Sequence, residues 1–117
     1  MLELAHRLAV TPPRRLAVFP GAFNPPTRAH LAMAEAALSA ADEVLFVLPR
    51  EFPHKAFEGP GFDERVAMIS AVAARDPRFS VGGTPRGLFI EIAEACRAVF
   101  GDATKLLFLC GSDAAER

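Results

Sequence analysis

The sequence predicts an α/β fold with a doubly wound parallel sheet, and three observations support this prediction. Short, wholly apolar runs alternate with segments whose apolar residues recur at helical spacing. The runs Val44–Leu48 and Leu106–Cys110 are apolar on both faces, as interior parallel strands are. The turn-rich loops Pro20–Thr27 and Arg50–Gly61 both follow predicted strands, and open α/β sheets bind ligands at that edge.

The first half of the chain predicts a strand, a helix, a strand and a loop. The apolar run Leu16–Phe19 ends at a Pro-Gly pair and predicts the first strand. Thr27 is a favourable N-cap for the helix that follows. The apolar stripe of this helix is Leu31, Ala34, Leu38 and Ala41. Val44–Leu48 predicts a second strand that Pro49 is expected to stop, and Arg50–Gly61 is expected to be a long loop.

The second half predicts two further helices and two further strands. Asp63 is expected to cap a helix that ends near the Asp76-Pro77 pair. The apolar stripe of this helix is Val66, Ile69 and Val72 or Ala73. Phe79–Val81 predicts a short strand. A third helix follows, with the stripe Leu88, Ile92, Ala95 and Val99. Leu106–Cys110 predicts the last strand, ended by Gly111, so the expected order is β-α-β-α-β-α-β.

The length of 117 residues predicts a single domain. We expect residues 1–14 to be an N-terminal extension and residues 15–117 to form the α/β domain. A doubly wound sheet normally continues beyond its fourth strand, so the domain is expected to be incomplete at its C-terminus.

Composition excludes several classes of partner. Thirteen basic and fourteen acidic residues give a formal charge of −1, which predicts no nucleic-acid or membrane surface. The longest apolar run is far shorter than the roughly 20 residues of a membrane-spanning helix, and Met1–Val10 lacks the pattern of a secretion signal. Cys96 and Cys110 are expected to be reduced core residues, which favours the cytoplasm. No pattern assigns an oligomeric state.

The loop between the first strand and first helix predicts an anion site. A helix N-terminus offers free N–H groups and a positive dipole end, and Thr27 and His30 share one face of the first turn. The alternative is that Thr27 only caps the helix while His30 is a surface imidazole. The loop has neither the G-x-G-x-x-G fingerprint nor the G-x-x-x-x-G-K-[ST] phosphate loop.

The loop resembles the signature G-x-F-x-P-x-[HT]-x-x-H of the HIGH-motif nucleotidylyltransferase superfamily, which it matches at Gly21, Phe23, Pro25, Thr27 and His30. Two more motifs lie after the expected strands, namely Pro53-His54-Lys55 and Gly111-Ser112-Asp113. With these, the chain is most similar to the nicotinate-mononucleotide adenylyltransferases. The resemblance implies the Rossmann-like nucleotidylyl transferase fold.

The resemblance also implies a reaction and the residues that perform it. Such enzymes use ATP together with Mg²⁺. They transfer AMP from ATP to nicotinate mononucleotide or a similar phosphate acceptor and release pyrophosphate, which is a step of NAD biosynthesis. By resemblance His30 and Lys55 are catalytic. The expected nucleotide- and phosphate-binding residues are Gly21, Ala22, Phe23, Thr27, His30, His54, Lys55, Gly111 and Asp113. No residue is predicted to ligate a metal directly.

Departures from the family pattern leave further functions open. Pro20 removes a backbone donor and Ala22 lacks a hydroxyl, which is consistent with a nucleotide-binding protein without catalysis. Gly87-Leu88-Phe89 replaces the Ser-Tyr-Thr of the relatives, which leaves open the use of CTP or of a different phosphorylated acceptor. Arg65 and Arg86 could meet an acceptor phosphate, but surface exposure is the expected explanation for both.

Overall fold

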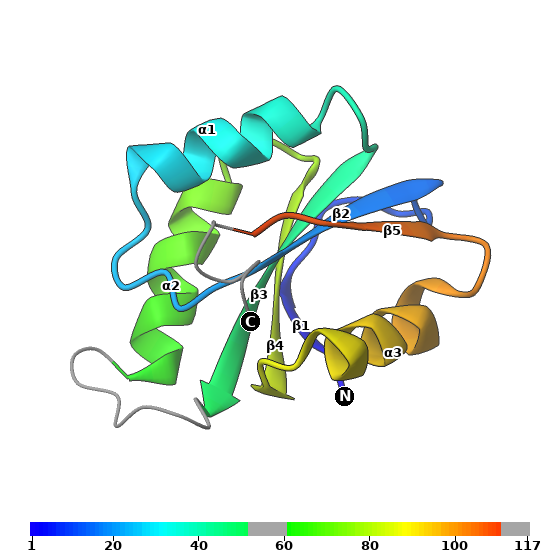
Figure 1. Cartoon of the computed structure of the whole chain (residues 1–117). Helices are drawn as coiled ribbons and strands as arrows, with labels where there is room; N and C mark the ends of the chain where they lie inside the picture. The colour runs from blue at the N-terminus through cyan, green and yellow to red at the C-terminus, as the bar shows by residue number, and fades with distance from the viewer. Residues whose placement is uncertain (52–60, 111–117) are drawn as a thin grey trace.

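The computed structural model describes residues 1–51 and 61–110, and in them a strand, a helix and a strand follow one another repeatedly (Figure 1). The strands are β1 (Glu3–His6), β2 (Arg15–Pro20), β3 (Glu43–Glu51), β4 (Phe79–Arg86) and β5 (Lys105–Phe108). The helices are α1 (Arg28–Ala37), α2 (Phe62–Ala73) and α3 (Phe89–Phe100). The predicted α/β class and the predicted order from the first long strand onward are confirmed.

The sheet has the strand order β1-β4-β3-β2-β5. Strands β2 to β5 run parallel to one another, and β1 is antiparallel to β4. The chain builds outward from β2 through β3 to β4, then crosses back to place β5 on the far side of β2. The direction of winding therefore reverses between β2 and β5, and ligands of open α/β sheets bind beyond the carboxyl ends of the strands at such a point.

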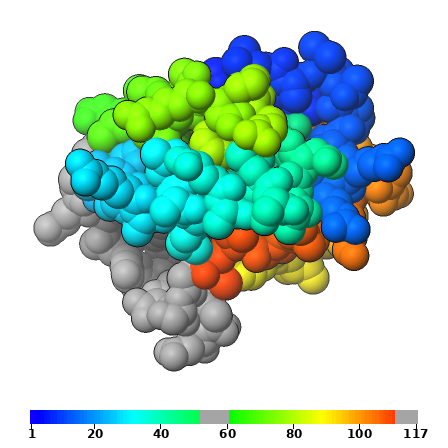
Figure 2. All heavy atoms as spheres, turned by 90° about the horizontal axis from the view of Figure 1, so that it is seen from above, coloured from blue at the N-terminus to red at the C-terminus, as the bar shows by residue number. Residues whose placement is uncertain are grey.

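Helices cover both faces of the sheet, as the prediction requires (Figure 1). Helices α1 and α2 lie side by side on one face, the one seen in Figure 2, and bury Ala34 and Ile69 against Phe46. Helix α3 covers the opposite face, where Ile92 packs with Leu45. Successive residues of β3 point to opposite faces, so only a strand that is apolar throughout can serve both cores.

Two strands are longer than predicted. Strand β3 continues through Pro49 to Glu51, where the prediction stopped it at the proline, and β4 extends five residues beyond Val81. Strand β2 ends opposite Val47, so past that point β3 keeps a single neighbour, β4, and the missing N–H of Pro49 does not end the pairing. The remainder of the expected loop, residues 52–60, lies outside the described residues.

The N-cap of α2 is Gly61, and the prediction of Asp63 as the cap was wrong. Asp63 lies with Glu64 in the first turn, where carboxylates also stabilise the positive end of the helix dipole. The buried stripe of α3 ends at Phe100, while Val99 is 43% exposed. The error at α2 is a shift of two positions and arises because capping and dipole preferences favour the same residue types at adjacent sites. The error at α3 is a shift of one position in the buried stripe.

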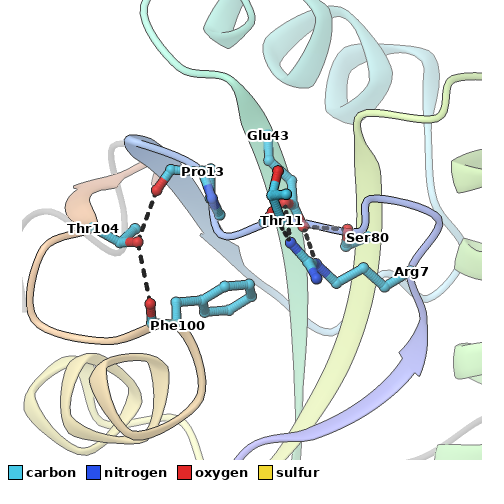
Figure 3. Close-up of polar contacts among 7 residues, drawn as sticks. All are labelled: Arg7, Thr11, Pro13, Glu43, Ser80, Phe100 and Thr104. Atoms are coloured by element: carbon cyan, nitrogen blue, oxygen red, sulfur yellow. Dashed lines mark hydrogen bonds and ion pairs between the residues drawn. The ribbon is translucent and has the colours of Figure 1, made fainter.

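Part of the segment expected to be an extension joins the sheet. Strand β1 pairs with β4, and beyond it the Arg7 guanidinium donates to both carboxylate oxygens of Glu43, at 2.9 Å each (Figure 3). The Ser80 hydroxyl also donates to the Glu43 carboxylate, which is 2% exposed. Farther along, the Thr104 hydroxyl donates to the Pro13 carbonyl at 2.7 Å. These contacts fix residues 3–13 against the amino-terminal edge of the sheet.

The described part of the chain contains no helix long and apolar enough to cross a membrane. Both cysteines are free thiols, as expected. Cys96 lies on the buried face of α3, and burial raises the pKa of its thiol to about 11. Cys110 is only partly buried.

Candidate functional site

The loop after β2 begins with a close approach between Gly21 and the Phe23 ring. The Gly21 N–H donates to the Val47 carbonyl at 3.0 Å, which holds the turn against the middle of β3. A Cβ atom on Gly21 would lie 3.1 Å from Cζ of Phe23, tighter than ordinary packing allows. Glycine at this position therefore lets the backbone fold over the ring.

Phe23 is the buried anchor of the loop. Its side chain is 2% exposed and packs edge-on against Phe19 and Phe46, with ring centroids 5.3 and 5.5 Å away. Its φ of 49° is in the left-handed region, which costs a non-glycine residue on the order of 1–2 kcal/mol. Ring burial compensates that cost. The loop continues through a cis peptide bond between Asn24 and Pro25.

Thr27 and His30 form a reciprocal capping box at the start of α1. The His30 N–H donates to Oγ1 of Thr27 at 3.3 Å, and the Thr27 N–H donates to Nδ1 of His30 at 2.9 Å. The prediction of Thr27 as the N-cap is confirmed. The expected pairing of the two residues on one face is found as well, with a direct contact between Oγ1 and Nδ1 at 3.2 Å.

The capping box sets the tautomer of His30. Because Nδ1 accepts the Thr27 N–H, the proton of the neutral ring is on Nε2. The ring packs edge-on against Phe23 and Phe19, with centroids 5.0 and 5.9 Å away. Burial of the ring lowers the pKa of His30 from its ordinary value of 6.5. Near neutral pH the site therefore presents an uncharged imidazole with one N–H donor directed away from the cap.

Arg65 was expected to be a surface arginine, and that expectation was wrong. Its side chain is among the largest that are fully buried, with the residue 2% exposed, and Nη1 donates to the Ala22 carbonyl at 3.3 Å. Arg65 thus connects α2 to the candidate loop. The sequence held a usable signal, because Arg65, Ile69 and Ala73 lie on one face of α2 at four-residue spacing.

Among the predicted site residues, the structure brings together those of the first motif, namely Gly21, Ala22, Phe23, Thr27 and His30. The remaining four, His54, Lys55, Gly111 and Asp113, lie outside the described residues. Arg86 is exposed and pairs with Glu91 at 2.7 Å.

The strands that precede the second and third motifs in the sequence, β3 and β5, both end at the carboxyl-terminal edge of the sheet. Glu51, the last described residue before the second motif, ends β3, which neighbours β2. The Leu109 N–H donates to the Val18 carbonyl at 2.8 Å, so the end of β5 lies beside β2 on its opposite side. The first motif therefore lies between the two strands from which the second and third motifs follow.

Within the described residues, no three His, Cys, Asp or Glu side chains form a group that could hold a metal ion. A hollow of about 540 Å³ is lined by residues of α1, of the turn after α2 and by Phe79, at the start of β4. Its lining includes no residue of the Gly21–Thr27 loop. The chemistry of the loop, rather than the presence of that hollow, identifies the candidate site.

Comparison with known proteins gives a family. A family model described as cytidylyltransferase-like matches residues 18–113. A probable nicotinate-nucleotide adenylyltransferase of Solibacter usitatus is 38% identical over 107 residues, which are 86% of this chain and 57% of that protein. A phosphopantetheine adenylyltransferase of Geobacter metallireducens is 35% identical over 79 residues, which are 68% of this chain and 47% of that protein.

A solved structure has the same fold. Nicotinic acid mononucleotide adenylyltransferase of Plasmodium falciparum, complexed with NaAD, superposes with a TM-score of 0.65 at 16% identity, over 86% of this chain and 53% of that one. The chain spans about half the length of the curated relatives it matches.

Proposed function

The chain belongs to the cytidylyltransferase-like family, and from this premise we propose that it is part of an enzyme that transfers AMP from ATP to nicotinate mononucleotide. The product pair would be nicotinate adenine dinucleotide and pyrophosphate, which is a step of NAD biosynthesis. The relatives named as probable nicotinate-nucleotide adenylyltransferases support this substrate.

The observation that carries the proposal is the fixed orientation of the His30 ring. Its Nδ1 is occupied by the Thr27 N–H, so the Nε2–H is the donor left for a ligand. The ring lies in the first turn of α1, directly after the loop that follows β2. A phosphate at this point would meet the imidazole donor and the positive end of the α1 dipole together.

In the proposed reaction, a phosphate oxygen of the acceptor attacks the α-phosphorus of ATP. One P–O bond forms, the bond from the α-phosphorus to the bridging oxygen of pyrophosphate breaks, and no covalent enzyme intermediate is needed. The protein contributes orientation and donors aimed at the charge that grows on the phosphoryl oxygens. Mg²⁺ would enter as part of the MgATP substrate and would neutralise charge on the leaving pyrophosphate.

The remaining expected site residues have roles only within this proposal. Lys55, with His54, would bring a cation over the triphosphate. Gly111 and Asp113 would approach the ribose of the nucleotide from the segment after β5. The strands that precede both motifs flank β2, which supports their convergence on the His30 loop.

A different phosphate acceptor is the second candidate. Gly87-Leu88-Phe89 replaces the polar Ser-Tyr-Thr of the nicotinate family, and Phe89 stacks on Phe108 with ring centroids 5.2 Å apart. Two matching relatives are named phosphopantetheine adenylyltransferases, which favours this second acceptor. The pyrophosphate assay described below also distinguishes the use of CTP in place of ATP and nucleotide binding without catalysis.

We expect the protein in the cytoplasm, where the substrates of this reaction are found.

Pyrophosphate release tests the proposal. The full-length protein is incubated with Mg²⁺ and either ATP or CTP, and with nicotinate mononucleotide, nicotinamide mononucleotide, phosphopantetheine or no acceptor. Release that requires ATP and nicotinate mononucleotide supports the first candidate. Release with phosphopantetheine alone would replace it by the second, and ATP binding without release from any acceptor would contradict both. The matched control is His30→Ala, which removes the proposed donor.

A further inference from the structure

We propose that Arg65 is a positioning residue that holds the Ala22–Phe23 peptide with its N–H turned toward the nucleotide phosphates. The inference rests on the proposed function, because it adds a backbone donor to the phosphate site described above. Arg65 would not touch the substrate itself. It would act through the loop.

The first step is the location of the guanidinium. Arg65 lies on the face of α2 that packs on the sheet, and the residue is 2% exposed. Its Nη1 donates to the Ala22 carbonyl at 3.3 Å, and its Cζ lies 5.7 Å from the centroid of the Phe62 ring. The cation is thus in the interior beneath the loop, and the Ala22 carbonyl is directed inward toward it.

The second step is the geometry of the peptide group. In a trans peptide, the C=O and the following N–H point in opposite directions. The described part of the chain has its cis bond at Asn24–Pro25, and the Ala22–Phe23 bond is trans. Because Arg65 holds the carbonyl on its own side, the Phe23 N–H is directed to the side of the loop that faces away from Arg65.

The third step explains why an anchor is needed there. Phe23 has a φ of 49°, a conformation that a phenylalanine rarely adopts without support from its surroundings. Rotation of the Ala22–Phe23 peptide would relieve this strain but would present a carbonyl oxygen to the phosphates. A charged donor on the carbonyl opposes that rotation and also polarises the N–H at the opposite end of the same peptide.

The test compares Arg65→Met and Arg65→Lys with Arg7→Met, a matched control at the opposite edge of the sheet whose guanidinium also pairs in a part-buried site. Each variant is assayed below its own Tm. For Arg65→Met we expect kcat to fall about tenfold or more while the KM of the acceptor stays within about twofold. Arg65→Lys should recover part of the loss, and Arg7→Met should keep a kcat within about twofold of the unmodified chain.

A second measurement observes the amide directly and does not depend on turnover. In ¹⁵N-labelled chain, MgATP and inorganic pyrophosphate should each shift the Phe23 amide resonance, and Arg65→Lys should reduce the shift. If neither ligand shifts the Phe23 amide resonance of the unmodified chain, the inference is overturned, even if Arg65→Met does not fold.

The outcomes separate this inference from the proposed function. Normal turnover by the unmodified chain and an Arg65→Met kcat equal to that of Arg7→Met would overturn the role of Arg65 and leave the function standing. Absence of turnover with every acceptor, combined with a Phe23 shift that depends on Arg65, would overturn the function and leave the positioning role standing.

Discussion

His30 takes the place in the α1 capping box that a glutamate or glutamine usually fills, and it accepts the Thr27 N–H through Nδ1 at 2.9 Å. A carboxylate in that position would stabilise the helix equally well but would repel a phosphate. An imidazole stabilises the helix and keeps a donor on its second nitrogen. The structural and the proposed chemical roles of His30 are therefore on different atoms, and substitution can separate them.

Substitution of His30 by glutamate should preserve the fold and abolish activity. His30→Glu completes a standard capping box, so its urea midpoint should equal or exceed that of the unmodified chain. Its turnover should fall by about a hundredfold or more, because the donor is replaced by a negative charge. His30→Ala should lose as much turnover and, in addition, about 1 kcal/mol of stability with the cap. Full pyrophosphate release by either variant would contradict the assignment, and His6→Ala is the control.

The stability of the chain should fall at acidic pH through His30. Burial lowers the pKa of His30 from 6.5, and protonation at Nδ1 would also remove the acceptor of the Thr27 N–H. As the pH falls below 6.5, the unfolded chain binds a proton that the native chain does not, so the free energy of unfolding decreases until the lowered native pKa is passed. Above that range this contribution is constant.

Urea unfolding at pH 7.5 and 5.5 measures this effect against His30→Gln. Glutamine can keep the capping contacts but does not titrate. The unmodified chain should therefore lose more stability between these pH values than the variant. Equal losses would show that other groups account for the acid sensitivity.

Removal of the Glu43 carboxylate should be strongly destabilising. Glu43 is 2% exposed and accepts from Arg7 and Ser80, so Glu43→Ala leaves a part-buried guanidinium without its anion, at a cost of about 3–5 kcal/mol. The double variant Arg7→Met, Glu43→Met should recover much of this loss, as measured by denaturant unfolding. If the double variant were as unstable as the two single changes combined, packing rather than charge pairing would explain the effect.

A methyl group on Gly82 should loosen β1. A Cβ atom there would lie 2.7 Å from Cδ1 of Leu2 and 3.2 Å from the Glu3 carbonyl oxygen. Gly82→Ala should therefore cost about 1–3 kcal/mol and speed amide exchange in β1. Gly87→Ala, where the new atom meets Pro49 at an ordinary 3.4 Å, is the control. Unchanged exchange in β1 would contradict this prediction.

Regular periodicity predicted most of the fold. The apolar run at the centre of β3 is buried on both faces by helices, and α1 begins at the N-cap that its sequence indicates. Strand ends were less predictable. A proline usually ends a strand, but Pro49 lies in the part of β3 that pairs with β4 and no longer with β2, so the strand continues. Strand β1 was missed, since its four residues carry no periodic signal and pair only through a partner distant in sequence.

The candidate site was predictable where the motif is local. The pairing of Thr27 with His30 follows from a spacing of three residues on a helix. The contact of Arg65 with Ala22 joins residues 43 positions apart, and no local rule predicts it. A buried arginine also contradicts the usual preference of that residue for the surface.

The antiparallel strand β1 covers part of the edge of β4 and should thereby limit self-association of the chain. Without it, the backbone groups of β4 that now face β1 would be unpaired, and such an open edge is a template for adding strands from other molecules. β1 is itself a poor template, because it has four residues, an irregular register between Leu4 and His6, and a charged residue in Glu3. A chain shortened to begin at Arg14 would keep every residue of the Gly21–His30 loop and should nevertheless aggregate.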